Sequence, residues 1–166
     1  MSDGQTPRLA LPMLQPGQAQ KELYHNEALA LIDVALQATV TAIGLNAPPT
    51  SPAPGACWVV GATPTGAWAG AAHQLAGWTT GGWRFVVPVN GMAVWSLADA
   101  LEARFVANSW VLGEARAARL MIGGVQVVGA RQPGIVPPAG GVTIDTEARA
   151  ATALILSALA AHGLIG

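Results

Sequence analysis

The sequence has few charged residues for its length. Among its 166 residues, Asp, Glu, Lys and Arg make up 10%, and eight basic against nine acidic residues leave a net charge of −1. A typical soluble domain carries about 25% charged residues. A chain with no basic surplus cannot neutralise many phosphates, so nucleic-acid binding is excluded as an expected function. Because 52% of the residues are hydrophobic, the composition is also the opposite of a disordered chain.

Cysteines and long apolar runs are scarce as well. Cys57 is the single cysteine, so the chain cannot form an internal disulfide or a CxxC metal motif. No apolar run reaches the roughly 18–20 residues of a membrane span, and residues 1–8 lack the apolar core of a signal peptide. We therefore expect no membrane insertion and no signal peptide. The low charge favours a homo-oligomer, in which other subunits cover part of the apolar surface.

The pattern of apolar residues and turn signals divides the chain into three parts and predicts an α+β fold. Residues 1–46 are expected to form an N-terminal arm and a long helix, because Gln18–Ile43 contains neither glycine nor proline. At 1.5 Å per residue, such a helix would be roughly 39 Å long. Apolar residues at near-heptad spacing make it a candidate oligomer interface, with a buried helix of a monomeric core as the alternative. The candidate interface residues are Leu29, Ile32, Leu36 and Ile43.

The middle part, residues 47–113, predicts a Trp-rich antiparallel β meander. It opens with the proline-rich linker Ala47–Gly55, which cannot continue a helix. Short apolar runs then alternate with turn signals about every ten residues. Gly81-Gly82 and Asn90-Gly91 are the strongest hairpin signals.

The last part, residues 114–166, predicts a strand, a loop rich in proline and glycine, and a C-terminal helix. Val125–Val128 has the composition of a strand. Asp145 is a suitable N-cap for the helix, and Gly163 suits the position after its end. Ile155 and Leu159 on this helix are further candidates for an oligomer interface. Packing against the N-terminal helix of the same chain is the alternative.

No group of residues points clearly to catalysis. The three histidines lie far apart, and none has the HxxxH spacing of a metal site. Asp99 and Glu102 are the carboxylates of the middle part, and their three-residue spacing is typical of a solvated face. Cys57 lies in an apolar run, which is typical of a buried and inert thiol. We expect no enzyme, no metal and no cofactor, although side chains distant in the sequence can converge.

The tryptophans are the most informative feature, because all six lie in the middle part. An indole ring offers a flat apolar face to a sugar ring and an N–H donor, but tryptophans of small β domains often form the core. Trp58 and Trp110 lie within apolar runs and are expected in the core. The candidate carbohydrate-binding residues lie near turns: Trp68, Trp78 and Trp83.

Residues Leu11–Asp33 contain the motif Gly-Gln-Ala-Gln-Lys followed by His-Asn-Glu-Ala. This stretch resembles the opening of an uncharacterised domain family from prophages and gene transfer agents of alphaproteobacteria. The resemblance continues through Ala47–Pro52, Gly66–Gly70 and Gly82–Phe85 and covers about residues 9–112. Residues 127–165 resemble a terminal module shared by several particle proteins. The family has no known catalytic residues to carry over.

The resemblance implies a structural component of a phage-like or gene-transfer-agent particle, either a head spike or a tail-fibre base. Such a protein would be assembled in the bacterial cytoplasm and would act in the virion, aiding attachment to host surface polysaccharide. Its implied partners are copies of itself, other virion proteins of the capsid, spike or fibre, and possible capsular polysaccharide of the host. Larger relatives carry a further fibre domain that this chain lacks, which favours a base or adaptor role. An assembly adaptor without glycan contact and a polysaccharide-active enzyme remain alternatives.

The shortage of charge has a definite location. No charged residue occurs between Val34 and Trp83. We therefore expect neighbouring subunits to cover this stretch.

Overall fold

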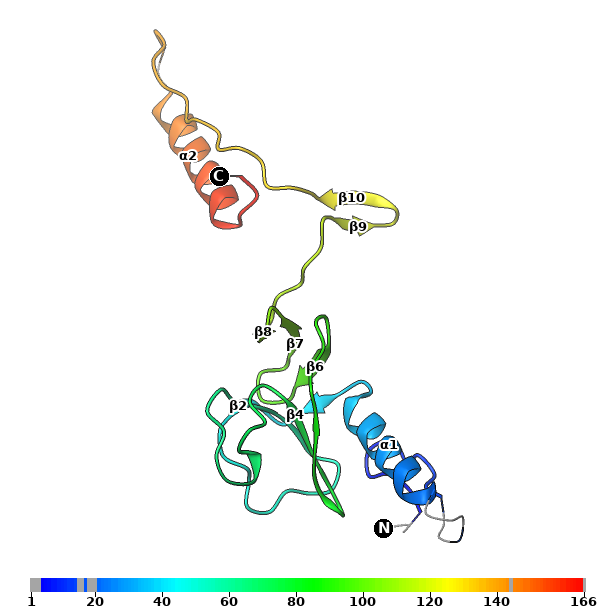
Figure 1. The fold of residues 1–166 in the computed structure, drawn as a ribbon. Coiled ribbons are helices and arrows are strands. Elements are labelled where there is room, and N and C mark those ends of the chain that lie inside the picture. Colours follow the sequence, from blue (N-terminus) through cyan, green and yellow to red (C-terminus); the bar gives the residue numbers. More distant parts are fainter. Residues whose placement is uncertain (1–3, 15–16, 18–20, 144, 166) are drawn as a thin grey trace. The chain divides into compact units, whose positions relative to one another are not determined.

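The computed structural model describes residues 4–14, 17, 21–143 and 145–165. The chain divides into two compact units, Met1–Glu114 (unit 1) and Ala115–Gly166 (unit 2) (Figure 1). Among its described residues, unit 1 contains one α-helix, one short 3-10 helix and the first eight strands. In chain order these elements are α1 (Lys21–Ala35), β1 (Thr39–Val40), β2 (Ile43–Leu45), β3 (Cys57–Val60), η1 (Gly66–Trp68), β4 (Leu75–Thr79), β5 (Gly82–Val86), β6 (Ala93–Ser96), β7 (Leu101–Val106) and β8 (Ser109–Leu112).

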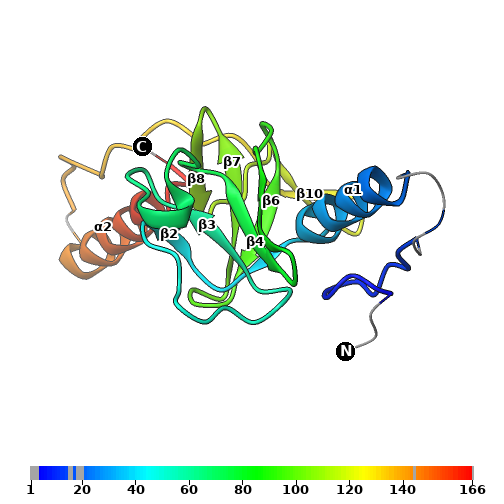
Figure 2. The ribbon, with the colours of Figure 1, turned by 60° about the horizontal axis from the view of Figure 1, so that its bottom comes forward.

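The strands of unit 1 form two four-stranded sheets rather than one meander. Sheet I has the order β2-β3-β4-β5, and sheet II has the order β1-β6-β7-β8. The runs β3–β5 and β6–β8 are antiparallel, but β2 pairs with β3 and β1 pairs with β6 in parallel. The predicted single antiparallel meander is therefore wrong. The chain first places one short strand, β1 or β2, at the edge of each sheet and then completes sheet I and sheet II in turn. Figure 2 shows the strands of both sheets, with β2, β3 and β4 labelled in sheet I and β6, β7 and β8 labelled in sheet II.

The predicted long N-terminal helix is also wrong. Helix α1 has 15 residues and ends at Ala35. Gln37 then adopts a left-handed φ of +45°, and β1 and β2 follow within the stretch that was expected to be helical. Residues 18–20 of the predicted helix lie outside the described residues.

Arg8 of the N-terminal arm provides the physical reason for this helix end. The last carbonyls of a helix have no partner within the helix. The Arg8 guanidinium donates hydrogen bonds to the carbonyls of Asp33, Val34, Leu36 and Gln37. The β-branched residues beyond this cap then favour extended strands.

The core of unit 1 lies between the inner faces of the two sheets and α1. Its buried residues are Val34, Ala38, Val40, Cys57, Val59, Leu75, Val94 and Ala103. Val34 of α1 packs directly on Gly77 of β4, where an added Cβ would overlap the Val34 side chain. Glycine at this position lets the helix approach the sheet closely.

Unit 2 contains a β-hairpin and the C-terminal helix. The hairpin consists of β9 (Leu120–Ile122) and β10 (Val125–Val128), and all of its strand residues are exposed. Helix α2 (Thr146–Ala161) begins after Asp145, whose side chain accepts a hydrogen bond from the Ala148 amide, and none of its residues is buried. The chain end returns to form a bridge between Ile165 and Gln132. Within the described part of the chain, no helix is both long and apolar enough to cross a membrane.

Candidate functional site

Four tryptophans form one cluster on the outer face of sheet I. Trp58 of β3, Trp78 of β4 and Trp83 of β5 share this face. Trp78 pairs directly with Trp83, and Trp58 pairs with Ala76, which lies two residues before Trp78 on the same side of β4. Trp83 is central: its ring centroid lies 4.9 Å from that of Trp78 and 5.6 Å from that of Trp58. Trp68 of η1 covers the cluster at 5.1 Å from Trp83. Long-range folding therefore brings Trp68, Trp78 and Trp83 together.

This cluster is packed rather than open. Trp68 is 0% exposed, so no face of its ring is accessible to a sugar. Trp78 and Trp83 are half-buried, and their rings contact each other at 63°. The three candidate carbohydrate-binding residues thus form the hydrophobic packing of the outer face of sheet I.

The two tryptophans expected in the core differ in burial. Trp58 is buried, with 6% of its surface exposed. Trp110 is half-buried, and its ring lies 5.3 Å from that of Phe105. Its indole N–H donates a hydrogen bond of 2.8 Å to the carbonyl of His73.

Trp95, which the sequence did not single out, is the exposed tryptophan. It is 47% exposed and makes no ring contact among the described residues. It lies on the outer face of sheet II, paired with Glu102 of β7 on one side and Thr39 of β1 on the other. Alternation along β6 indicates this exposure, because its neighbours Val94 and Ser96 are buried on the opposite face.

Glu102 and Arg104 lie beside Trp95 on the same face, two residues apart on β7. Arg104 Nη2 donates a hydrogen bond to Glu102 Oε1 at 2.7 Å. Both side chains are about half exposed, Arg104 at 42% and Glu102 at 51%. Arg104 Nη1 also donates to the Gly91 carbonyl at 3.1 Å. Trp95, Glu102, Arg104 and Thr39 together are called the Trp95 platform. A flat ring beside held hydrogen-bonding groups can stack on a sugar and bind its hydroxyls.

The two carboxylates of the middle part have separate roles. Asp99 accepts a hydrogen bond of 2.6 Å from the Ser96 hydroxyl, whereas Glu102 pairs with Arg104. Among the described residues, no group of three or more His, Cys, Asp or Glu side chains could hold a metal ion. Cys57 is 1% exposed, and burial raises the pKa of its thiol to about 11. A thiol of this kind is a poor nucleophile.

One family model matches residues 25–111, and its description is "Protein of unknown function (DUF2793)". The chain belongs to this family. The DUF2793 region starts within α1, ends within β8 and includes the tryptophan cluster and the Trp95 platform. Its description assigns no function and no kind of particle. A comparison with curated proteins found no significant match.

The four interface candidates of the N-terminal part, which lie in the DUF2793 region, do not form one row along a single helix. Leu29 and Ile32 lie on α1, Leu36 lies in the turn after it, and Ile43 lies in β2. Ile32 and Leu36 are exposed, at 47% and 54%, whereas Leu29 and Ile43 are half-buried. On α2, outside the DUF2793 region, Ile155 is 60% exposed and Leu159 is half-buried.

The stretch without charge between Val34 and Trp83 contains much of the core of the DUF2793 region. Val34, Val40 and Leu75 belong to the cluster between the sheets. Trp58 and Trp68 belong to the cluster on the outer face of sheet I. Burial within unit 1 therefore explains the absence of charge at these core positions. Other residues of the stretch, such as Leu36 and Leu45, are exposed, and their coverage by a neighbouring subunit stays a prediction.

Proposed function

We propose that this DUF2793 protein is a structural component of a phage-like or gene-transfer-agent particle. The proposed place is the head spike or the tail-fibre base, and the proposed role is to aid attachment to host surface polysaccharide. The particle assignment comes from the resemblance of residues 9–112 and 127–165. The polysaccharide contact is supported by one observation, the exposed Trp95 ring beside the Glu102–Arg104 pair.

The Trp95 platform has the chemistry that a saccharide needs. The apolar face of a sugar ring stacks on an indole, and its hydroxyls can donate to Glu102 or accept from Arg104. One small platform supplies modest affinity, because a flat surface buries only part of its ligand. Several copies in one particle would raise the overall strength of attachment through multivalency. A homo-oligomer would therefore strengthen the proposed glycan contact.

The test compares the adsorption of particles to capsule-bearing cells. Trp95→Ala removes the stacking face, and we expect adsorption to fall about tenfold, which corresponds to 1.4 kcal/mol. Val89→Ala is a matched control, because Val89 is 69% exposed and lies in the loop before β6. Electron microscopy verifies that each variant assembles normally. Unchanged adsorption of normally assembled Trp95→Ala particles would contradict a glycan contact at this platform.

An assembly adaptor without glycan contact is the second candidate. It is favoured by the enclosure of Trp68 within the tryptophan cluster and by the exposed apolar residues of unit 2. The adaptor predicts normal adsorption of Trp95→Ala particles but defective assembly when α2 is changed. No contact among the described residues favours a polysaccharide-active enzyme.

A further inference from the structure

The N-terminal arm, residues 4–14, is fixed to α1 at two separate points. At the first, the buried Asp33 carboxylate accepts hydrogen bonds from Thr6 Oγ1 at 2.7 Å and from the amides of Arg8 and Leu9 at 3.0 and 2.6 Å. At the second, Asn26 exchanges two hydrogen bonds with the backbone of Leu14, at 2.9 and 3.0 Å. These contacts hold the arm at both ends of a cavity of about 580 Å³. Small-molecule sites have volumes of this order.

The cavity has one apolar and one polar side. The apolar side consists of Ala10 and Met13 of the arm, Leu23 and Ala30 of α1, and Pro54. The polar side includes Glu27 of α1 and Thr80 and Arg84 of the β4–β5 hairpin. The other polar lining residues are Gln5, Thr6, Asn26 and Thr79. A ligand in this cavity would therefore contact four parts of unit 1: the arm, α1, the loop at Pro54 and the β4–β5 hairpin.

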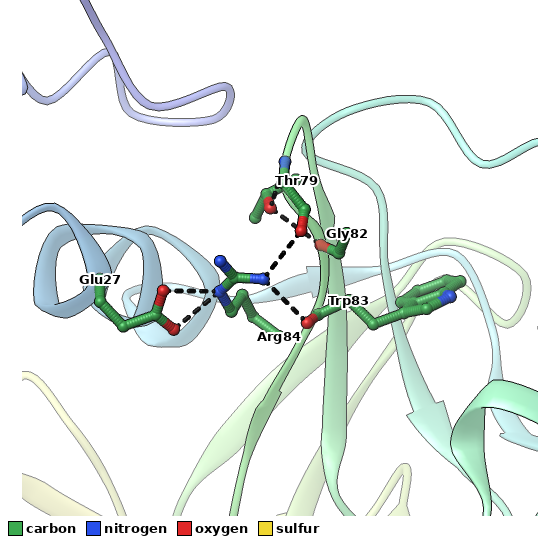
Figure 3. A network of polar contacts seen from close by, with 6 residues as sticks. Glu27, Thr79, Gly82, Trp83 and Arg84 are labelled. Carbon is green, nitrogen blue, oxygen red and sulfur yellow. Dashed lines mark hydrogen bonds and ion pairs between the residues drawn. The ribbon is translucent and has the colours of Figure 1, made fainter. Parts of the chain in front are cut away.

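The polar side is held in place by a network of contacts (Figure 3). Arg84 Nε lies 2.7 and 2.8 Å from the two carboxylate oxygens of Glu27. Arg84 Nη1 donates to the carbonyls of Gly81 and Trp83 at 3.3 and 3.1 Å. Nη2 takes no part in these bonds. The Trp83 ring lies on the other side of β5, within the tryptophan cluster.

This arrangement places a donor and an acceptor side by side next to an apolar surface. Nη2 of Arg84 can donate, and the Glu27 carboxylate has lone pairs that can accept a further hydrogen bond. A charged ligand is disfavoured, because an anion would lie against Glu27 and a cation against Arg84. A secondary amide carries one acceptor and one donor in the matching arrangement.

We propose that this cavity binds an uncharged secondary amide with a small apolar substituent. The amide carbonyl accepts from Arg84 Nη2, the amide N–H donates to Glu27, and the substituent lies against Ala30 and Met13. Both an N-acetylated amino sugar and a peptide group present this chemistry. The site is separate from the Trp95 platform, so the proposal does not depend on the proposed polysaccharide contact.

The test is a titration of the full-length protein, followed by the backbone amide signals in NMR spectra. The probes are N-acetylglucosamine, glucose as the sugar without an amide, and N-acetylalanine methylamide as the peptide group. We expect saturable shifts at residues 23–30 and 79–84, with a dissociation constant on the order of 1 mM. Saturation by the sugar amide alone, or by the peptide amide alone, identifies the source of the ligand. Saturation by both shows that the amide itself is recognised.

Two variants locate the site, and a third is the control. Arg84→Lys removes Nη2, and Leu23→Trp obstructs the cavity from a position that is 65% exposed, so the second variant remains informative if the first unfolds. We expect each to weaken amide binding at least about tenfold. Arg119→Lys, at an exposed arginine of unit 2 that lies in neither site, should bind as the unchanged protein does. The proposal is overturned if neither amide gives saturable shifts at residues 23–30 and 79–84, if glucose shifts these residues equally well, or if Leu23→Trp gives the same shifts as the unchanged protein.

Discussion

At the scale of single residues, Cys57 connects burial to the pH dependence of stability. Burial raises the pKa of the thiol from 9.0 to about 11, and the smaller effects of Arg8 and Asp33 oppose each other. Between these two values the unfolded chain has lost the thiol proton while the folded chain retains it. The unfolded state then binds fewer protons, so the free energy of unfolding decreases as the pH rises.

This linkage predicts a difference between the protein and its Cys57→Ala variant. Urea unfolding of each of the two proteins at pH 8 and at pH 10.5 measures how far its free energy of unfolding falls over this pH range. We expect the variant to lose less stability than the unchanged protein, because it lacks the shifted thiol. An equal loss in both would show that the thiol pKa is not raised in the folded state.

The burial of the tryptophans predicts a second contrast at this scale. Trp68 is 0% exposed and Trp95 is 47% exposed. Replacing a buried tryptophan with alanine costs about 3–5 kcal/mol, whereas an exposed substitution changes stability by about 0.5 kcal/mol or less. Trp68→Ala should therefore lower the free energy of unfolding far more than Trp95→Ala in the same urea titration. Similar losses would contradict the assignment of Trp68 to packing and Trp95 to the surface.

At the scale of secondary-structure elements, the end of α1 depends on one side chain from outside the helix. The Arg8 guanidinium contacts four carbonyls at the end of α1. Arg8→Gln removes the charge and the forked donor, and leaving such carbonyls without partners costs about 1–3 kcal/mol. We expect lower stability and faster hydrogen exchange of the amides in the last turn of α1.

Arg119→Gln is the matched control for this prediction, because it removes an exposed arginine of unit 2. It should leave both the stability of unit 1 and the exchange in α1 unchanged. If Arg8→Gln behaves like this control, Arg8 does not stabilise the end of the helix.

The same helix end explains how far the fold could be predicted from the sequence. The C-terminal helix begins after Asp145. This N-cap residue is a local signal, because it lies directly before the helix that it starts. The end of α1 depends on Arg8, which lies 25 residues before Asp33, and on Gln37 in a conformation that usually requires glycine. The place of β1 at the edge of sheet II depends on the pairing of Thr39 with Trp95. Neither distant contact leaves a local pattern in the sequence.

The candidate site shows the same limit. The sequence placed the tryptophans in a β region but could not show which face of each strand they occupy. The turn-proximal Trp78 and Trp83 lie opposite each other in sheet I and pack together. Trp95 is exposed because its side of β6 faces away from the core. Which alternate residues of β6 face the core depends on how this strand pairs with β1 and β7.

At the scale of the whole molecule, unit 2 exposes a large apolar surface. Ile165 is the single buried residue among those described in this unit. Apolar residues on both faces of the hairpin are exposed, including Met121 at 43% and Ile122 at 63%. An isolated two-stranded hairpin is at best marginally stable in water. Both faces of the hairpin and the apolar side of α2 would gain stability from burial against other chains.

A homo-oligomer formed through α2 is therefore the final prediction. Light scattering at micromolar concentration should give the full chain a mass of several copies. Ile155→Asp should reduce that mass, since burying an isoleucine contributes about 1.5–3 kcal/mol and an unpaired buried carboxylate is costly. Val89→Asp adds the same charge at an exposed position of unit 1 and should not reduce the mass.

Ile32→Asp tests the α1 candidates by the same measurement. A single-chain mass for the unchanged protein would contradict self-association outside the particle, and an unchanged mass for Ile155→Asp would exclude α2 as the interface.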